Sequence, residues 1–239
     1  MAPSQLTPSS IAAMCFRLVR WLWWPAERMI WRTRRVLLAM RAHILARVSG
    51  GRIELDLAHD IKLGRRITLD IQPGTQNRLE IGAQTSVGDD AVLQFLGGTM
   101  SFGARTIIRK GFRADSSGKL RVGDDVFIGY GTFLHCNNST AVLDRAVLAE
   151  YVVVTDSSHL RTPEDVPNFH HVRSAPTVVG ANSWIGAHSV VTAGVRVGDG
   201  AFVGASAVVT SDVSSGWLVA GNPARPVRRL DIEEVDGAG

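Results

Sequence analysis

The 239-residue sequence contains only two cysteines, Cys15 and Cys136, and no Cys-x-x-Cys pair. This excludes a disulfide scaffold and a cysteine zinc site, and it fits a reducing, cytosolic compartment. The 24 glycines follow no Gly-X-Y period, which excludes collagen, and 45% hydrophobic with 20% charged residues is the composition of a globular protein. No P-loop, dinucleotide-binding glycine fingerprint or Gly-x-Ser-x-Gly elbow occurs, so a covalent acyl-enzyme is not indicated.

The net charge of +4 is unevenly distributed along the chain. Residues 1–50 carry eight arginines and a single acid, Glu27, for a net charge of +7, which leaves −3 for residues 51–239. The basic character therefore belongs to an N-terminal segment and not to the body of the protein. This distribution argues against nucleic acid as a partner.

The N-terminal segment, residues 1–50, is basic, rich in tryptophan and helical in pattern. We expect helices over 11–24 and 26–48, because Pro25 interrupts the pattern and Gly50 with the following glycine ends it. Arginines interrupt the apolar run, which is also too short for a membrane span. The same arginines, and the lack of a small-residue cleavage site after the run, argue against a signal peptide.

Four of the six tryptophans lie in this segment among arginines, a mixture suited to the headgroup zone of an anionic membrane. Two interpretations of residues 11–48 stay open. They contact the inner face of a membrane peripherally, or they pack as a helical cap on the body or on a neighbouring subunit. In either case we expect a cytoplasmic protein.

From residue 51 onward the helical period is replaced by a period of six. An aliphatic residue recurs six times in one register, at Val179, Ile185, Val191, Val197, Val203 and Val209. Glycine directly follows four of these six residues. Shorter runs repeat the pattern near Leu63, Ile81, Val87, Val122 and Ile128, with weaker turns at Leu143, Ala149 and Thr155.

This period predicts an all-β fold, a parallel β-helix over residues 51–230. Each hexapeptide supplies a short strand and a corner, with the aliphatic side chain inward and a small residue where a Cβ would clash. Residues 157–176 break the repeat and predict a protruding loop, and 231–239 predict a flexible tail. An antiparallel sandwich is the alternative, but a fixed six-residue repeat does not favour it.

The repeat region resembles the hexapeptide-repeat acyltransferases, especially galactoside and maltose O-acetyltransferases and polysaccharide-modifying relatives. Three segments carry the resemblance: Val179-Gly-Ala-Asn-Ser-Trp-Ile-Gly-Ala, Val203-Gly-Ala-Ser-Ala-Val-Val-Thr and Ala220-Gly-Asn-Pro-Ala-Arg-Pro-Val-Arg. The resemblance implies a left-handed helix, a homotrimer with active sites between subunits, and transfer from acetyl-CoA or another acyl-CoA. A carbohydrate or glycolipid hydroxyl would be the acceptor.

Acyl transfer to a hydroxyl needs a general base, and histidine is suited to that role near neutral pH. His159 ends a repeat strand and opens the loop, where a rigid strand meets a mobile segment, and the family places its catalytic histidine at this junction. Asp156 or Glu150 is a candidate to orient the imidazole ring. We expect His135 and His188, inside repeats, to face solvent or pack at corners.

The remaining site predictions follow from the resemblance and from residue type. The backbone N–H of Ala187 would stabilise the oxyanion. Asn137, its neighbour Asn138 and Asp156 are candidates to bind the acceptor. The predicted CoA contacts are Trp184, Ala205, Thr210, Ser211, Pro223 and Arg225. Family members often carry lysine where Ser211 stands, which weakens that part of the prediction.

Two other functions remain open. The γ-class carbonic anhydrases share the fold and bind zinc through histidines, for which His159, His170, His171 and His188 would be available. Their spacing does not match, and we expect no metal. A non-catalytic trimeric scaffold tethered to a membrane is the second alternative.

Overall fold

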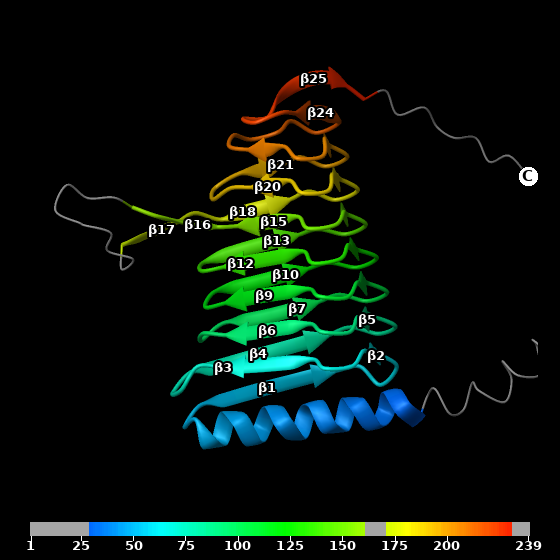
Figure 1. The fold of residues 1–239 in the computed structure, drawn as a ribbon, viewed down its shortest axis with the longest axis vertical. Coiled ribbons are helices and arrows are strands. Elements are labelled where there is room, and N and C mark those ends of the chain that lie inside the picture. Colours follow the sequence, from blue (N-terminus) through cyan, green and yellow to red (C-terminus); the bar gives the residue numbers. More distant parts are fainter. Residues whose placement is uncertain (1–28, 161–170, 231–239) are drawn as a thin grey trace, which may run out of the picture.

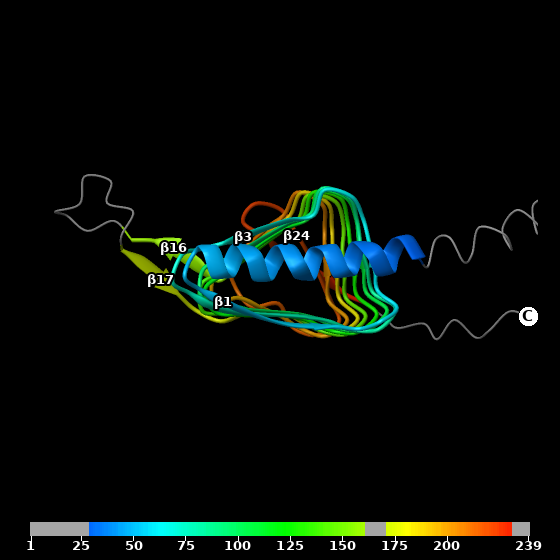
Figure 2. The same ribbon diagram turned by 90° about the horizontal axis from the view of Figure 1, so that it is seen from below.

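The computed structural model describes residues 29–160 and 171–230, which form a helix over 29–48 and a tall parallel β-solenoid (Figure 1). Three short strands make one triangular coil, and each coil stacks on the one before it. In the two views together the chain rises from the helix end and winds in a left-handed sense (Figures 1 and 2). The β-helix expected from the six-residue period is confirmed.

The three sides of the solenoid are three sheets, called A, B and C, in which strands pair in parallel except for β24 with β25. Sheet A contains β1 (Arg52–Leu57), β4 (Gln76–Ile81), β7 (Thr99–Phe102), β10 (Lys119–Val122), β13 (Ser139–Val142), β18 (Thr177–Val179) and β21 (Arg196–Val197). Sheet B contains β2 (Lys62–Leu63), β5 (Ser86–Val87), β8 (Ile107–Ile108), β11 (Phe127–Ile128), β14 (Val147–Leu148), β19 (Trp184–Ile185), β22 (Phe202–Val203), β24 (Trp217–Ala220) and β25 (Arg225–Arg229). Sheet C contains β3 (Thr68–Ile71), β6 (Val92–Phe95), β9 (Arg113–Ser116), β12 (Phe133–Cys136), β15 (Val153–Thr155), β20 (Val190–Val191) and β23 (Val208–Val209).

Aliphatic ladders fill the interior of the solenoid. The six residues of the clearest repeat, from Val179 to Val209, are all at most 1% exposed. The weaker turns were predicted one residue too late. The inward side chains there are Val142, Leu148 and Val154, because successive side chains in a strand point to opposite faces.

The glycines after the inward aliphatics are required by close stacking of coils. A Cβ built on Gly186 would lie 2.5 Å from the backbone nitrogen of Ala205 in the next coil. The left-handed backbone conformation falls elsewhere, for example at Asn182 and His188, whose φ angles are 56° and 60°. The expected role of these glycines, avoidance of a Cβ clash, is confirmed at Gly186.

The helix over 29–48 lies across the open end of the first coil (Figures 1 and 2). Leu38, Ala42 and Ala46 are its buried residues and cover the core there. The expected helix over 26–48 is thus confirmed in its described part, whereas 11–24 lies outside the described residues. Within the part of the chain that the structure describes, no helix is long and apolar enough to span a bilayer.

A two-stranded antiparallel hairpin leaves the solenoid after β15 (Figure 1). Its strands are β16 (Ser157–His159) and β17 (Val172–Ser174). The predicted loop over 157–176 therefore begins and ends as regular structure, and its residues 161–170 lie outside the described range.

Neighbouring isoleucines in β8 test the inward ladder directly. Ile108 is 2% exposed and Ile107 is 45% exposed. We expect Ile108→Ala to lower the free energy of unfolding by about 2–5 kcal/mol, because it leaves a cavity in the core. Ile107→Ala, measured beside it by urea unfolding, should cost far less, and equal losses would contradict the assigned faces.

Candidate active site

His159 lies where the solenoid meets its hairpin. Residues Val153 to Thr155 belong to sheet C, and the chain leaves the coil at Asp156 to form β16, in which exposed His159 pairs with Val172. The Ala175 N–H donates to the Asp156 carbonyl at 2.8 Å, which closes the base of the hairpin. The sequence-based prediction of a histidine at a strand end beside a loop thus agrees with its position.

The carboxylate of Asp156 is completely buried and holds the turn next to the hairpin. One oxygen accepts the N–H of Asn137 and the other accepts those of Asn138 and Ser139, each at 2.7 Å. Such charge-assisted bonds are about twice as strong as neutral ones. Asp156 therefore faces inward as a support for the turn and does not present its carboxylate to an acceptor. Glu150 follows β14 at another corner of the triangle and is not placed to orient His159.

The turn that Asp156 supports carries the two asparagines predicted to bind the acceptor. The side chain of Asn137 donates to the Ser174 hydroxyl at 2.7 Å and accepts from the Ser117 hydroxyl at 2.8 Å. It thereby ties the turn to β17. Among the described residues the exposed side chain of Asn138 makes no hydrogen bond, so Asn138 is the more available of the pair.

Ala187 lies in a different turn, which links β19 of sheet B to β20 of sheet C. Its N–H donates no hydrogen bond within the described part of the chain, while its carbonyl accepts the N–H of Ser206. Beside it the ring of His188 stacks on Tyr151 with centroids 5.0 Å apart. Sequence reasoning placed His188 at a corner, as observed, but gave no signal of its stacking partner from the coil below.

The predicted CoA contacts are spread over four places. Ala205 lies one coil above Ala187 at the same corner, and Thr210 with Ser211 follows β23 on the side of His159. Trp184 is 44% exposed on the outer face of sheet B, where it stacks on Phe202 with ring centroids 5.7 Å apart.

Pro223 and Arg225 lie at the far end of the solenoid. Both are exposed, between and within the last two strands, β24 and β25.

The predicted site residues are thus not united within one chain. The turn with Ala187 and the turn with His159 lie at opposite ends of the sheet C strands, which are four residues long in the regular coils. Four residues of extended chain span about 13 Å. Within one chain the predicted residues therefore form two groups at separate corners of the coil.

His135 lies on the outer face of sheet C and has a charged neighbour that was not predicted from the sequence. His135 in β12 lies beside Asp115 in β9, with Nδ1 3.8 Å from Oδ2, and the other Asp115 oxygen is buried without a hydrogen bond among the described residues. The Asp115 carboxylate beside the ring raises the pKa of His135. One coil contains twenty residues here, so an acid twenty residues before a histidine is the sequence pattern that could have revealed the pair.

This pair predicts a pH-dependent stability. Because the folded-state pKa of His135 is raised, its contribution is fully present below the unfolded value of about 6.5 and is lost as pH rises through the folded value. We expect the difference in melting temperature between wild type and His135→Gln to shrink with rising pH across this window. Asp115→Asn should remove the same pH dependence, and a difference that is constant with pH would contradict the assignment.

The six-residue repeat also occurs in known proteins. The family described as bacterial transferase hexapeptide (six repeats) matches residues 176–211. The chain carries the hexapeptide repeat of bacterial transferases. The match covers the upper coils, including Trp184, Ala187 and Thr210, and ends at Ser211.

Two of the similar solved structures are of acyltransferases. AntD, an N-acyltransferase from Bacillus cereus in complex with dTDP and 3-hydroxybutyryl-CoA, is 17% identical with a TM-score of 0.50, covering 74% of this chain and 83% of its own. The polySia-specific acetyltransferase NeuO is 20% identical with a TM-score of 0.43, covering 78% and 91%. At these identities the likeness to AntD shows the fold of the hexapeptide-repeat protein.

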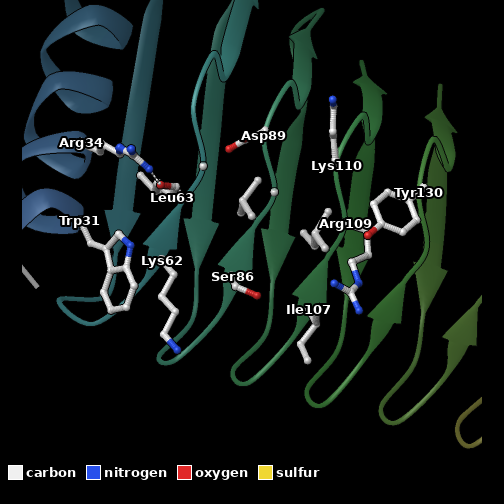
Figure 3. A pocket seen from close by; sticks show the side chains of 14 residues that line it. Trp31, Arg34, Lys62, Leu63, Ser86, Asp89, Ile107, Arg109, Lys110 and Tyr130 are labelled. Carbon is white, nitrogen blue, oxygen red and sulfur yellow. Dashed lines mark hydrogen bonds between the residues drawn. The ribbon is translucent and has the colours of Figure 1, made fainter. Parts of the chain in front are cut away.

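A separate hollow lies between the helix and sheet B. A cavity of about 440 Å³ is lined by Trp31 and Arg34 from the helix and by side chains of the first four coils (Figure 3). Lys62 extends over the ring of Trp31, with Nζ 5.1 Å from the centroid. Its lining includes neither His159 nor Ala187, so this hollow is distinct from both corners that carry the predicted site residues.

The described residues contain no group of three histidine, cysteine or acidic side chains placed to hold a metal ion. Of the histidines considered for zinc, His170 lies outside the described range.

Proposed function

We propose that this protein transfers an acyl group, acetyl in the simplest case, from coenzyme A to a hydroxyl of a sugar, polysaccharide or glycolipid. The observation that carries the proposal is the position of His159, exposed at the end of β16 in the hairpin whose base Asn137 joins to the turn of Asn137 and Asn138 through Ser174. The transferase repeat over 176–211 supports the reaction class. A point mutant of AntD, which shares the fold, has been solved with dTDP-4-amino-4,6-dideoxyglucose and coenzyme A, and a site that holds both a sugar nucleotide and the coenzyme fits the proposed reaction class.

In the proposed reaction His159 accepts the proton of the acceptor hydroxyl as the oxygen attacks the thioester carbonyl. The carbonyl electron pair moves onto oxygen, where the N–H of Ala187, which donates to no other described residue, stabilises the negative charge. Collapse of the tetrahedral intermediate breaks the carbon–sulfur bond. The protonated imidazole then returns its proton to the CoA thiolate, and no redox change or metal is needed.

The separation of the two groups of predicted residues supports a homotrimer with sites between protomers. His159 of one protomer would meet Ala187 of its neighbour, because about 13 Å of strand keeps the two apart within one chain. The CoA arm would then run past Trp184, Ala205, Thr210 and Ser211, and its phosphates would reach Pro223 and Arg225, where a guanidinium suits phosphate. The exposed Asn138 would contact the acceptor, with Asn137 fixing its turn.

Two measurements test this function. We expect CoA to raise the melting temperature, and acetyl-CoA with a panel of sugar acceptors to release free thiol. Binding of CoA without transfer to any hydroxyl or amine would contradict the reaction. Absence of CoA stabilisation would contradict the whole proposal and favour the non-catalytic scaffold.

A further inference from the structure

The helix over 29–48 has two opposite apolar faces. Its inner face packs on the first coil through Leu38, Ala42 and Ala46. Its outer face is exposed at Met29, Ile30, Val36, Leu37, Met40, Ile44 and Val48, with Met40 55% and Ile44 58% exposed. Each residue turns a helix by about 100°, so Met40 and Ala42 point about 200° apart. The outer stripe therefore faces away from the solenoid.

Capping the solenoid does not explain this outer stripe. Terminal caps of solenoids normally present a polar outer face, which keeps the end soluble. A contiguous exposed apolar patch marks an interaction surface. A partner other than the solenoid is therefore expected on the outer face.

The charges around the stripe identify the kind of partner. Residues 29–48 contain five arginines and no acid. Arg34 and Arg35 donate hydrogen bonds to the carbonyls of Leu63 and Ala58 and so hold the helix on the body. The side chains of the exposed Arg32, Arg41 and Arg47 make no hydrogen bond or ion pair with another described residue.

We infer that the outer face of this helix docks on an anionic lipid surface. An apolar stripe flanked by arginines inserts into the headgroup boundary while the arginines attract acidic lipids. A second copy is a poorer partner, because pairing two such faces would place unneutralised arginines against each other. The described helix lies on the bilayer and does not cross it.

Docking through the cap fixes the orientation of the body. Since the helix lies across the end of the solenoid, the coils rise away from the lipid surface (Figures 1 and 2). The β15 strand that leads to His159 is the fifth in sheet C, so at about 4.8 Å per coil the histidine stands roughly 20 Å above the first coil. If the proposed function holds, the reacting hydroxyl belongs to a sugar that extends this far from a lipid anchor.

The test uses the full chain and vesicles of phosphatidylcholine alone or mixed with phosphatidylglycerol, separated by flotation. We expect binding to the mixed vesicles, weakened about tenfold or more in the triple variant Leu37→Gln, Met40→Gln, Ile44→Gln, because three apolar side chains no longer insert. Glutamine keeps the helix propensity high. The control Ile107→Gln with Val227→Gln changes exposed apolar residues on the solenoid and should bind like wild type.

A charge variant completes the design. Arg32→Gln with Arg41→Gln and Arg47→Gln should weaken binding to the mixed vesicles and reduce its salt sensitivity. Undiminished binding by the apolar triple variant, or equal binding of wild type to neutral vesicles, would overturn the inference. So would a change in oligomeric state of that variant without lipid, which would assign the face to a second copy. Thiol release with a soluble acceptor reports separately on the proposed function.

Discussion

His159→Ala is expected to lower kcat/KM for acyl transfer by about 10²–10⁴-fold, the usual contribution of a positioned general base. The loss should fall on kcat, with the KM for acetyl-CoA little changed, because the imidazole acts on the acceptor proton. Thiol release under saturating acetyl-CoA measures the effect.

The matched control for this variant is His43→Ala, which removes an exposed histidine from the cap helix. It should leave transfer to a soluble acceptor at the wild-type rate. Unchanged turnover in His159→Ala with an intact melting temperature would remove this residue from the mechanism. In that case His135, which lies beside Asp115 in sheet C, would be the next base to test.

Asp156→Ala should lower the free energy of unfolding by about 2–4 kcal/mol, since it leaves three backbone N–H groups without their acceptor. Activity should fall as well, because the turn at 137–139 and the hairpin of His159 are joined through Asn137 and Ser174. Urea unfolding measures the first effect and thiol release the second.

Asp199→Ala provides the comparison for this loss. Asp199 is an exposed corner acid that accepts one backbone N–H, that of Ala181, at 2.9 Å. Its replacement should cost about 1 kcal/mol or less, as expected for one exposed hydrogen bond. Similar losses for the two aspartates would show that Asp156 does not support the turn as described.

In the weaker repeats the sequence pattern did not predict which residue faces inward. Strong repeats such as that at Ile185 were placed correctly, because aliphatic and glycine positions agreed. At Leu143, Ala149 and Thr155 the register was one residue late. At Val142 and Leu143 two aliphatic residues are neighbours, and only stacking on the coils above and below decides which of them faces inward.

The direction of the Asp156 side chain could not be predicted from the sequence. Its place three residues before His159 suggested a role in acceptor binding or ring orientation, but a sequence position does not fix the direction of a side chain. Its carboxylate meets three N–H groups from the preceding coil, seventeen to nineteen residues earlier. Contacts between coils also created the pairs of His135 with Asp115 and of Tyr151 with His188.

The sequence by itself determined the solenoid, its inward ladder and the junction at which His159 stands, because a six-residue period is a local pattern that each coil repeats. Only the tertiary structure decided which residues share a corner, that Ala187 and His159 lie at opposite ends of the sheet C strands, and which face of the cap helix is left open. Those relations arise from the stacking of coils, which brings together residues about twenty positions apart.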